Sequence, residues 1–282
     1  MTVSSISNTN TSSGTYTVQS GDVSSDLNAT TNASTTGTIS DAAGNAMESF
    51  AYASNFNSKS IVVETTAPTI SNVTSSTNNG TYGIGQDVNI TVTFSENVTM
   101  SGSGGVFKVP LETGSTNADY ELSISSISNS STGSGTYTVR ENDDTAGSDL
   151  EVKASPGLST TGTVKDHPAG NTLSDFAIPD GQNLDDLKNI KIDGSYPTIT
   201  NVTSTKSDGT YGIGEVIPIN VTFSEDVTLA NGTLDLVLNH GNNSNSKISV
   251  ATFSGSSSAS QNYTVAAGDT TNDLNHLSLI HI

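Results

Sequence analysis

The sequence predicts an all-β protein made of tandem sandwich domains, and three observations carry this prediction. Val88, Ile90, Val92 and Phe94 alternate with polar residues, which is the period of a strand with one buried face. No apolar pattern with helical spacing is sustained, and Gly-containing turn pairs recur about every ten residues. Finally, long segments of the chain repeat, which indicates several domains of one type.

The first repeated segment sets the size of the domain. The sequence from Ala67 to Thr99 returns from Tyr196 to Thr228, and Pro68 and Pro197 are 129 residues apart (197 − 68). A unit of this length is large enough to bury a core of its own, unlike a short solenoid repeat. The strand of Val88 to Phe94 is accordingly expected again at Ile217 to Phe223.

A second repeated segment defines the domain boundaries. The pattern of Gly14 to Leu27 recurs at Gly135 to Leu150 and at Asn262 to Leu274, so this late motif occurs three times and the early motif twice. We therefore predict that residues 1–65 form the C-terminal part of one repeat, 66–194 a complete repeat, and 195–282 the N-terminal part of a third. Residues 276–282 have no counterpart, and we interpret them as a sequence-assembly artefact.

Two side-chain placements follow from the repeated strands. The tyrosines Tyr16, Tyr137 and Tyr263 are each followed two residues later by a valine, so ring and valine are expected to share the buried face. Pro218 occupies the slot of Asn89, and because proline cannot donate to a ladder, we expect an outward, edge-like or bulged position there rather than a central one.

Composition excludes several functional classes. The formal charge of −19 argues against nucleic acid and anionic membranes as partners and favours cations. No apolar run is long enough to span a bilayer, so no membrane insertion is expected in this segment. Cysteine is absent, the four histidines lack metal-ligand spacing, and no nucleophile motif occurs, so we predict that the chain is not an enzyme.

Several motifs in a fixed order resemble the bacterial immunoglobulin-like, cadherin-like tandem repeats of large surface or secreted adhesins. They are VVETTAP at 62–68, the GTYGIG and VTFSE segments, the late motif, and DAAGN at 41–45. The resemblance implies a rod of Ig-like sandwiches on the cell surface or outside the cell, commonly stiffened by calcium. The chain departs from the pattern at KIDGSYP (191–197) and at DHPAGN (166–171), which has one residue more than DAAGN.

Sandwich topology groups the acidic residues at the domain junctions. Loops that follow the second and sixth strands lie at the N-terminal end of such a domain, and calcium takes oxygen ligands from converging loops. With Glu96 taken as the end of its strand, the first junction is expected to gather these residues: Asp22, Asp26, Glu64, Glu96, Asp166 and Asn171. The second is expected to gather Asp143, Asp149, Asp193, Glu225 and Asp226, and a site shared with a preceding domain would use Asp41 and Asn45.

A simpler interpretation stands beside the calcium hypothesis. Asp and Asn side chains often accept backbone hydrogen bonds in tight turns, so each of these residues can be explained by turn formation or solvation alone.

The functional expectation is a structural spacer whose partners are the neighbouring repeats, with host or matrix glycans or proteins contacted through other regions. Two alternatives remain: a glycan- or protein-binding Ig-like module, and a non-catalytic appendage of a large secreted enzyme. A binder predicts an enlarged loop with aromatic or Arg anchors, yet aromatic residues are few and Arg140 is the only arginine.

Overall fold

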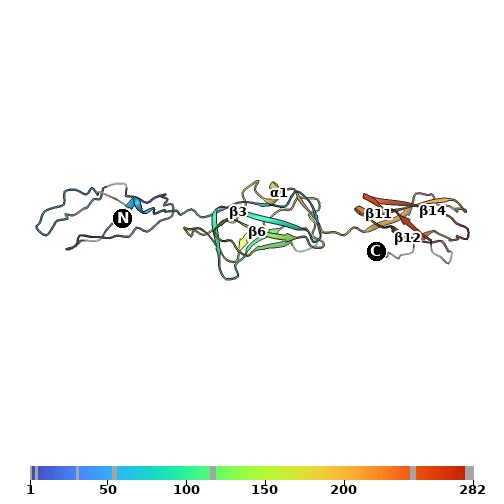
Figure 1. Ribbon diagram of the computed structural model, residues 1–282, viewed down its shortest axis with the longest axis horizontal. Coiled ribbons are helices and arrows are strands. Elements are labelled where there is room, and N and C mark those ends of the chain that lie inside the picture. The colour runs from blue at the N-terminus through green and yellow to red at the C-terminus, as the bar shows by residue number, and fades with distance from the viewer. Residues whose placement is uncertain are drawn as a thin grey trace. The chain divides into compact units, whose positions relative to one another are not determined.

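The computed structural model describes residues 2–3, 6–29, 32–52, 56–114, 119–241 and 246–276. The predicted artefact at 276–282 lies outside the described residues, apart from position 276. The chain divides into two compact units, Met1–Gly194 and Ser195–Ile282, which are considered separately below. Nearly all of the regular structure is antiparallel β-sheet, which confirms the predicted all-β class (Figure 1). Among the described residues, no helix has both the length and the apolarity needed to cross a membrane.

The centre of unit 1 consists of two facing sheets. The first contains β1 (Ile70–Ser75), β3 (Asp87–Ser101), β6 (Ser130–Thr138) and β8 (Thr163–Asp166). The second contains β5 (Tyr120–Ile124), β4 (Phe107–Leu111) and β7 (Ser159–Thr160). The short parallel pair of β2 (Gly80–Gly83) and β9 (Ile190–Asp193) completes this region, together with the helical turn α1 (Leu184–Leu187). The helical turn η1 (Phe56–Lys59) belongs to the segment before Val63 (Figure 1).

The core lies between these sheets and follows the alternation in the sequence. Val88, Ile90 and Val92 of β3 are fully buried, as the period of two predicts. Phe94 of β3 meets Phe107 of β4 edge to face, with ring centroids 5.7 Å apart. The two sheets therefore share one continuous hydrophobic cluster, which gives the central repeat a core of its own.

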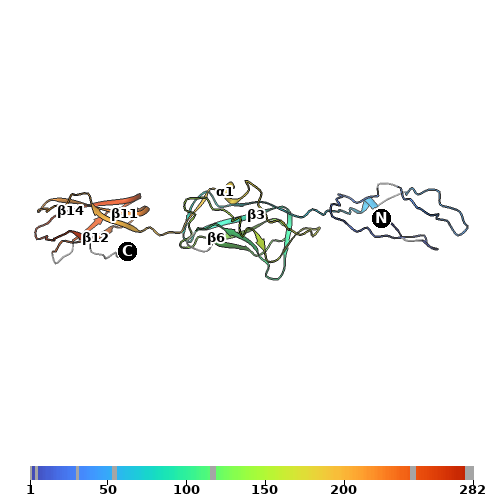
Figure 2. The same cartoon turned by 180° about the vertical axis from the view of Figure 1, so that it is seen from behind.

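Unit 2 repeats the first part of this architecture. One sheet has the order β10 (Ile199–Ser204), β11 (Val216–Leu229), β14 (Phe253–Thr264), and the other β13 (Ser246–Val250), β12 (Leu234–Asn239), β15 (Asn275–His276) (Figure 2). Ile199 pairs with Phe223 as Ile70 pairs with Phe94. The repeated early motif thus folds with the same strand register in both units.

The expected placement of Pro218 is confirmed in part: its side chain alternates with the buried Ile217 and Ile219 and so faces away from the core. Its strand, β11, is central between β10 and β14, and Pro218 pairs with Asn262. The position tolerates proline because β10 ends at Ser204, which pairs with Ile219, so no strand neighbour remains on that side. In the central repeat the corresponding Asn89 N–H donates to the Thr77 hydroxyl at 2.9 Å rather than to a strand.

The segment before Val63 is nearly without strand pairing. In its described part, the β-pairings found are the isolated bridges Ser24↔Val63 and Ser40↔Ala46. Tyr137 and Tyr263 are buried as predicted, but Tyr16 is 42% exposed, so the same prediction was wrong for the first copy. Tyr137 lies in β6, a strand of the late motif that pairs with β3 of the early motif, and residues 1–65 contain only the late motif. The assignment of 1–65 as part of a repeat stays a prediction.

Candidate metal centre

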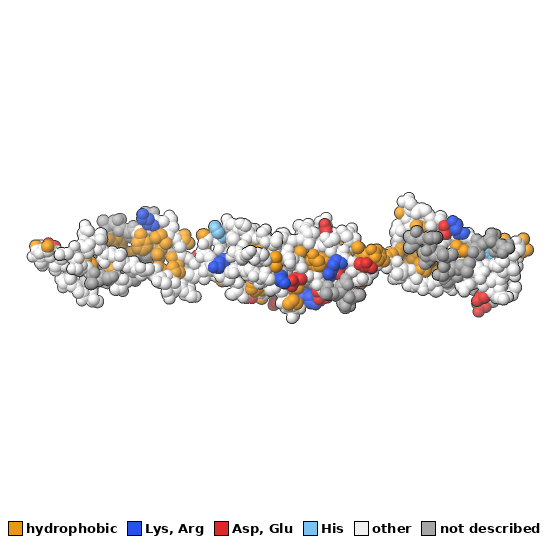
Figure 3. Space-filling view, turned by 90° about the horizontal axis from the view of Figure 1, so that it is seen from below, with side chains coloured by type: hydrophobic (Ala, Val, Ile, Leu, Met, Phe, Trp, Pro, Cys, Tyr) orange, Lys and Arg blue, Asp and Glu red, His pale blue; other side chains and the backbone are white. Residues whose placement is uncertain are grey.

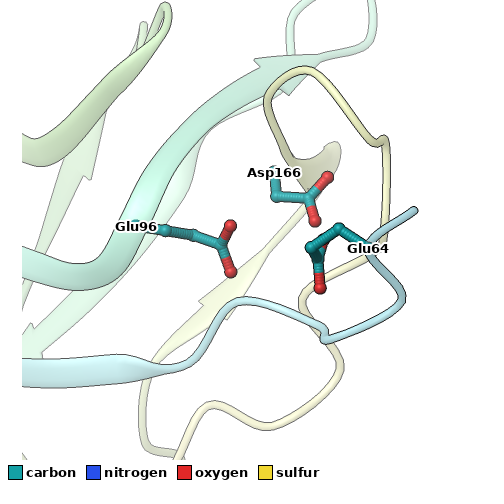
Figure 4. A group of neighbouring side chains, drawn as sticks. All are labelled: Glu64, Glu96 and Asp166. Atoms are coloured by element: carbon teal, nitrogen blue, oxygen red, sulfur yellow. The ribbon is translucent and has the colours of Figure 1, made fainter. Parts of the chain in front are cut away.

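Three carboxylates from separate parts of unit 1 converge where the linker enters the central repeat. Glu64 lies in the segment leading into β1, Glu96 lies within β3, and Asp166 ends β8. One oxygen from each lies within 4.8 Å of the others, and their side chains point toward one another (Figure 4). These are three of the six residues expected at the first junction, and with Asn171 a fourth lies beside them.

An irregularity in β3 positions Glu96. The pairing of β3 with β6 shifts register between Thr93 and Val98, so Glu96 lies in the irregular stretch. Beyond it, Val98 pairs with Asp166, which brings β8 alongside the second half of the strand. The expectation that Glu96 closes its strand was therefore wrong, because β3 continues to Ser101. The carboxylates still meet, since Asp166 of β8 pairs with Val98, two residues after Glu96 in β3.

The loop after β8 fixes Asp166. Its Oδ1 accepts hydrogen bonds from the backbone N–H groups of Gly170 and Asn171, and its Oδ2 accepts one from Asn171 Nδ2 at 2.7 Å. In the first copy, Asn45 donates the same two bonds to Asp41 as Asn171 donates to Asp166, and a further backbone N–H bond to Asp41 comes from Ala43. The loop geometry thus survives the extra residue in DHPAGN. One oxygen of each aspartate serves the turn, as the simpler interpretation expects.

Asn171 also connects this loop to Glu64. Its Nδ2 donates to Glu64 Oε2 at 2.8 Å and to Asp166 Oδ2, so one amide group lies between two carboxylates. Glu64 Oε1 accepts from the backbone N–H of Thr66. These bonds hold the linker residue against the central repeat.

The electrostatics of the cluster are unfavourable without a cation. Burial raises the pKa of Glu96, and the nearby charges of Asp166 and Glu64 raise it further. The ion pairs found among the described residues involve none of these three carboxylates. An all-oxygen set of this kind suits a hard cation such as Ca²⁺, with backbone oxygens and water as further ligands. The donor chemistry therefore fits calcium.

Two predicted ligands have a structural role instead. Asp143 is fully buried and accepts from the Tyr137 hydroxyl at 2.7 Å, from Arg140 N at 3.0 Å and from Arg140 Nε at 2.9 Å. Asp22 accepts from Tyr16 and from the Gln19 N–H in the same way. The third copy repeats the pair of Tyr263 and Asp269, so a Tyr-Asp hydrogen bond across six residues anchors the loop in every copy. These carboxylates are not brought to the cluster.

Of the remaining predicted residues, Asp26 was expected at this junction and the others at the second junction or at the site of Asp41 and Asn45, and none belongs to the group of three carboxylates. Asp26 and Asp149 each have a buried Oδ1 that finds no hydrogen-bond partner among the described residues. Asp193 pairs through its backbone with Gly83 and Asp144. Glu225 and Asp226 belong to β11 of unit 2, and Asp41 and Asn45 bond to each other in their own loop. Within the described ranges, none of these residues joins a group of three close metal-ligating side chains.

A second acidic region was not anticipated from the sequence. A cavity of about 690 Å³ in unit 1 is lined by Glu112, Asp144, Asp149, Glu151 and Asp185 among others. Burial raises the pKa of Glu151, and the charges of Asp185 and Glu112 add to the effect. These carboxylates come from separate segments of one repeat, so no local sequence motif predicts that they lie together. Their oxygens do not converge as those of the first cluster do.

Comparison with known proteins does not assign the chain to a family. No protein-family model matches it, and no curated protein matches it either.

Proposed function

We propose that this chain is a structural spacer from a bacterial surface or secreted adhesin, built of tandem Ig-like repeats and stiffened by calcium where the linker enters the central repeat. The observation that carries the proposal is the convergence of Glu64, Glu96 and Asp166 within 4.8 Å. The 129-residue repetition (197 − 68) supports the spacer role, because consecutive copies each with a core extend a chain without requiring any chemistry.

The proposed stiffening has a direct physical basis. Glu64 belongs to the linker, whereas Glu96 and Asp166 belong to the sandwich, so a cation bound by all three would tie the linker to the domain. Without the cation, burial raises the pKa of Glu96, and repulsion by the charges of Asp166 and Glu64 adds to the effect. Calcium would bind the ordered arrangement and stabilise it by mass action.

The side chain most suited to ligand recognition is already engaged. Arg140, the only arginine, donates to Asp143, and its guanidinium lies 5.0 Å from the centroid of the Tyr120 ring. Arginine and aromatic side chains are the usual anchors of binding sites. Because these two half-buried side chains are already engaged within the repeat, a spacer is favoured over a binding module.

The test is small-angle scattering of the whole chain with calcium and with a chelator. A larger maximum dimension or a narrower distance distribution in calcium supports the spacer model, and identical curves contradict calcium stiffening. The Glu96→Gln variant should lose the calcium response. The control is Glu48→Gln, which removes an exposed carboxylate outside the cluster and should respond like the parent.

Calcium affinity is measured in parallel by titration calorimetry. If calcium binds but the scattering curves do not change, the cluster is a metal site that does not stiffen the chain. An unchanged response in Glu96→Gln would move the effect to other carboxylates and overturn the assignment of this cluster.

A further inference from the structure

One edge strand of the central repeat lacks the protection that edge strands usually have. An edge strand exposes unpaired backbone N–H and C=O groups, and proteins shield it by shortness, by charge, by proline or by a covering segment. β6 pairs with β3 on one side, and among the described residues no strand pairs with its other side. The strand has nine residues, none of them charged and none of them proline. Its free edge is therefore open to pairing.

The other edges of the two facing sheets are shielded. At β1, Val73 N donates to the carbonyl oxygen of Gln182 in the segment before α1. β5 carries Glu121, which forms an ion pair with Lys108 of β4 at 2.6 Å. Charged side chains of both signs lie beside one another on the central repeat (Figure 3). β7 has two residues, and β8 has four, of which one is a lysine and one an aspartate. The open edge of β6 is the exception among them.

The pairing with β3 shows which backbone groups of β6 face outward. Asn89 of β3 lies opposite Thr136 of β6. The Asn89 N–H donates to the Thr77 hydroxyl, and the Asn89 carbonyl accepts from the Ser75 hydroxyl, so both groups face away from β6. Opposite residues of an antiparallel pair exchange both hydrogen bonds or neither, so the N–H and C=O of Thr136 face the open side, as do those of residues two positions away. Within the described ranges, no hydrogen bond is found to the backbone groups of these outward-facing residues: Ser134, Thr136 and Thr138.

The corresponding edge of unit 2 is closed by a side chain. β14 and β6 align through the late motif that they share, which places Asn262 at the position of Thr136. The Asn262 N–H donates to Gln261 Oε1 at 3.1 Å. The residue before Thr136 is Gly135, which has no side chain that could accept this bond. The open edge thus belongs to the central repeat.

We propose that β6 pairs antiparallel with β6 of a second copy of this chain, about a two-fold axis at Thr136. This register sets Thr136 opposite its own counterpart and Ser134 opposite Thr138, so each outward-facing residue gains a partner. The pairing ends before Thr132, whose N–H and C=O are already bonded to the Ser130 hydroxyl. An uncharged strand is also where two chains of formal charge −19 can approach with little repulsion. Because a two-fold contact uses the same patch on both copies, the product is a closed dimer.

Crosslinking tests the register, because the chain contains no cysteine. The Thr136→Cys chain should form a disulfide-linked dimer under mild oxidation. Directly opposite residues of such a pair have Cα atoms about 5.5 Å apart, within the range of about 4.4–6.8 Å that a disulfide spans. Thr132→Cys is the matched control: Thr132 is also exposed on β6 but lies four residues from the axis (136 − 132), so it should link poorly. Equal yields from the two chains would overturn the proposed register.

Sedimentation velocity tests the association itself. The sedimentation coefficient of the whole chain should rise with concentration to that of a dimer. Thr136→Pro should abolish the rise, because it removes an outward-facing N–H at the axis without removing a bond to β3. Asn262→Pro is the matched control, since it removes an N–H that is bonded to the neighbouring Gln261 side chain, and it should dimerise like the parent. No rise in the parent, or a rise unaffected by Thr136→Pro, would refute the pairing.

A second pair of variants keeps the test valid if circular dichroism shows that a proline variant has lost its strands. Ser134→Glu places a carboxylate at the edge of both copies and should abolish the rise, since charge protects an edge strand. Ser260→Glu is the control, because Ser260 is exposed at the corresponding position of β14. Equal dimerisation of the two glutamate variants would overturn the assignment of the contact to β6. The dimer should persist in chelator, which separates it from the calcium proposal.

Discussion

Asn171 Nδ2 donates a hydrogen bond to Glu64 Oε2 at 2.8 Å, across 107 residues of sequence. The same nitrogen donates to Asp166 Oδ2 at 2.7 Å. In the absence of a cation, this amide is the neutral donor that separates two carboxylates, and it links the linker to the loop after β8. Loss of the Asn171 amide is therefore expected to loosen the linker more than the sandwich.

Asn171→Ala should loosen the linker. The variant leaves two carboxylates without a shared donor, and a hydrogen bond to a charged group is worth about 1.5–3 kcal/mol. Faster amide exchange is expected at Thr66, whose N–H donates to Glu64, while exchange in β3 should stay slow. Asn45→Ala is the control, because Asn45 bonds only within the Asp41 loop among the contacts found. Equal effects of the two substitutions at Thr66 would contradict the linking role.

Glu96→Gln should stabilise the calcium-free protein at neutral pH. The pKa of Glu96 is raised in the folded state, so its favourable contribution is full below the ordinary value of 4.5 and is lost as the pH rises through the raised value. In chelator, denaturant unfolding should give the variant a higher free energy of unfolding than the parent at pH 7. This difference in stability should disappear near pH 4. With calcium the order should reverse at pH 7. A pH-independent gap would show that the charge of Glu96 is not its cause.

How far the sequence predicts this structure depends on how local each signal is. The alternation around Ile90 and Val92 predicts β3 because a period of two can be recognised within a few consecutive residues. The meeting of Glu64 with Asp166 follows from topology, since loops at one end of a sandwich converge. The continuation of β3 past Glu96 depends on pairing with β8, which no local pattern reveals.

The predictions for Asp143 and Tyr16 differ from the structure for specific reasons. Asp143 was grouped with metal ligands by its position in the topology, yet the chain carried a better signal: a Tyr and an Asp six residues apart in all three late motifs. Tyr16 was expected to be buried because its motif matches that of Tyr137. Burial, however, depends on strands that pair from distant sequence, and the motif alone does not supply them.

Tyr137→Phe should destabilise the central repeat by about 1–3 kcal/mol, because it removes a donor from a fully buried carboxylate. Burial raises the pKa of Tyr137 and the bond to Asp143 raises it further, so the hydroxyl remains a donor across the neutral range. Tyr16→Phe is the matched control, since the same bond to Asp22 lies at an exposed site. Urea unfolding followed by far-UV circular dichroism should separate the two. Equal losses would mean that burial does not set the strength of this pair.

Gly114→Ala should be among the most damaging single-methyl additions in the central repeat. Gly114 has φ +103°, and an added Cβ would overlap the carbonyl oxygen of Asp144. Left-handed backbone costs a non-glycine residue about 1–2 kcal/mol, and overpacking adds about 1–3 kcal/mol. Gly147→Ala isolates the first contribution, because Gly147 has φ +83° with no atom within 4 Å of an added Cβ. Thermal unfolding should therefore show a clearly larger loss for Gly114→Ala, and equal losses would indicate that the Asp144 loop moves aside without cost.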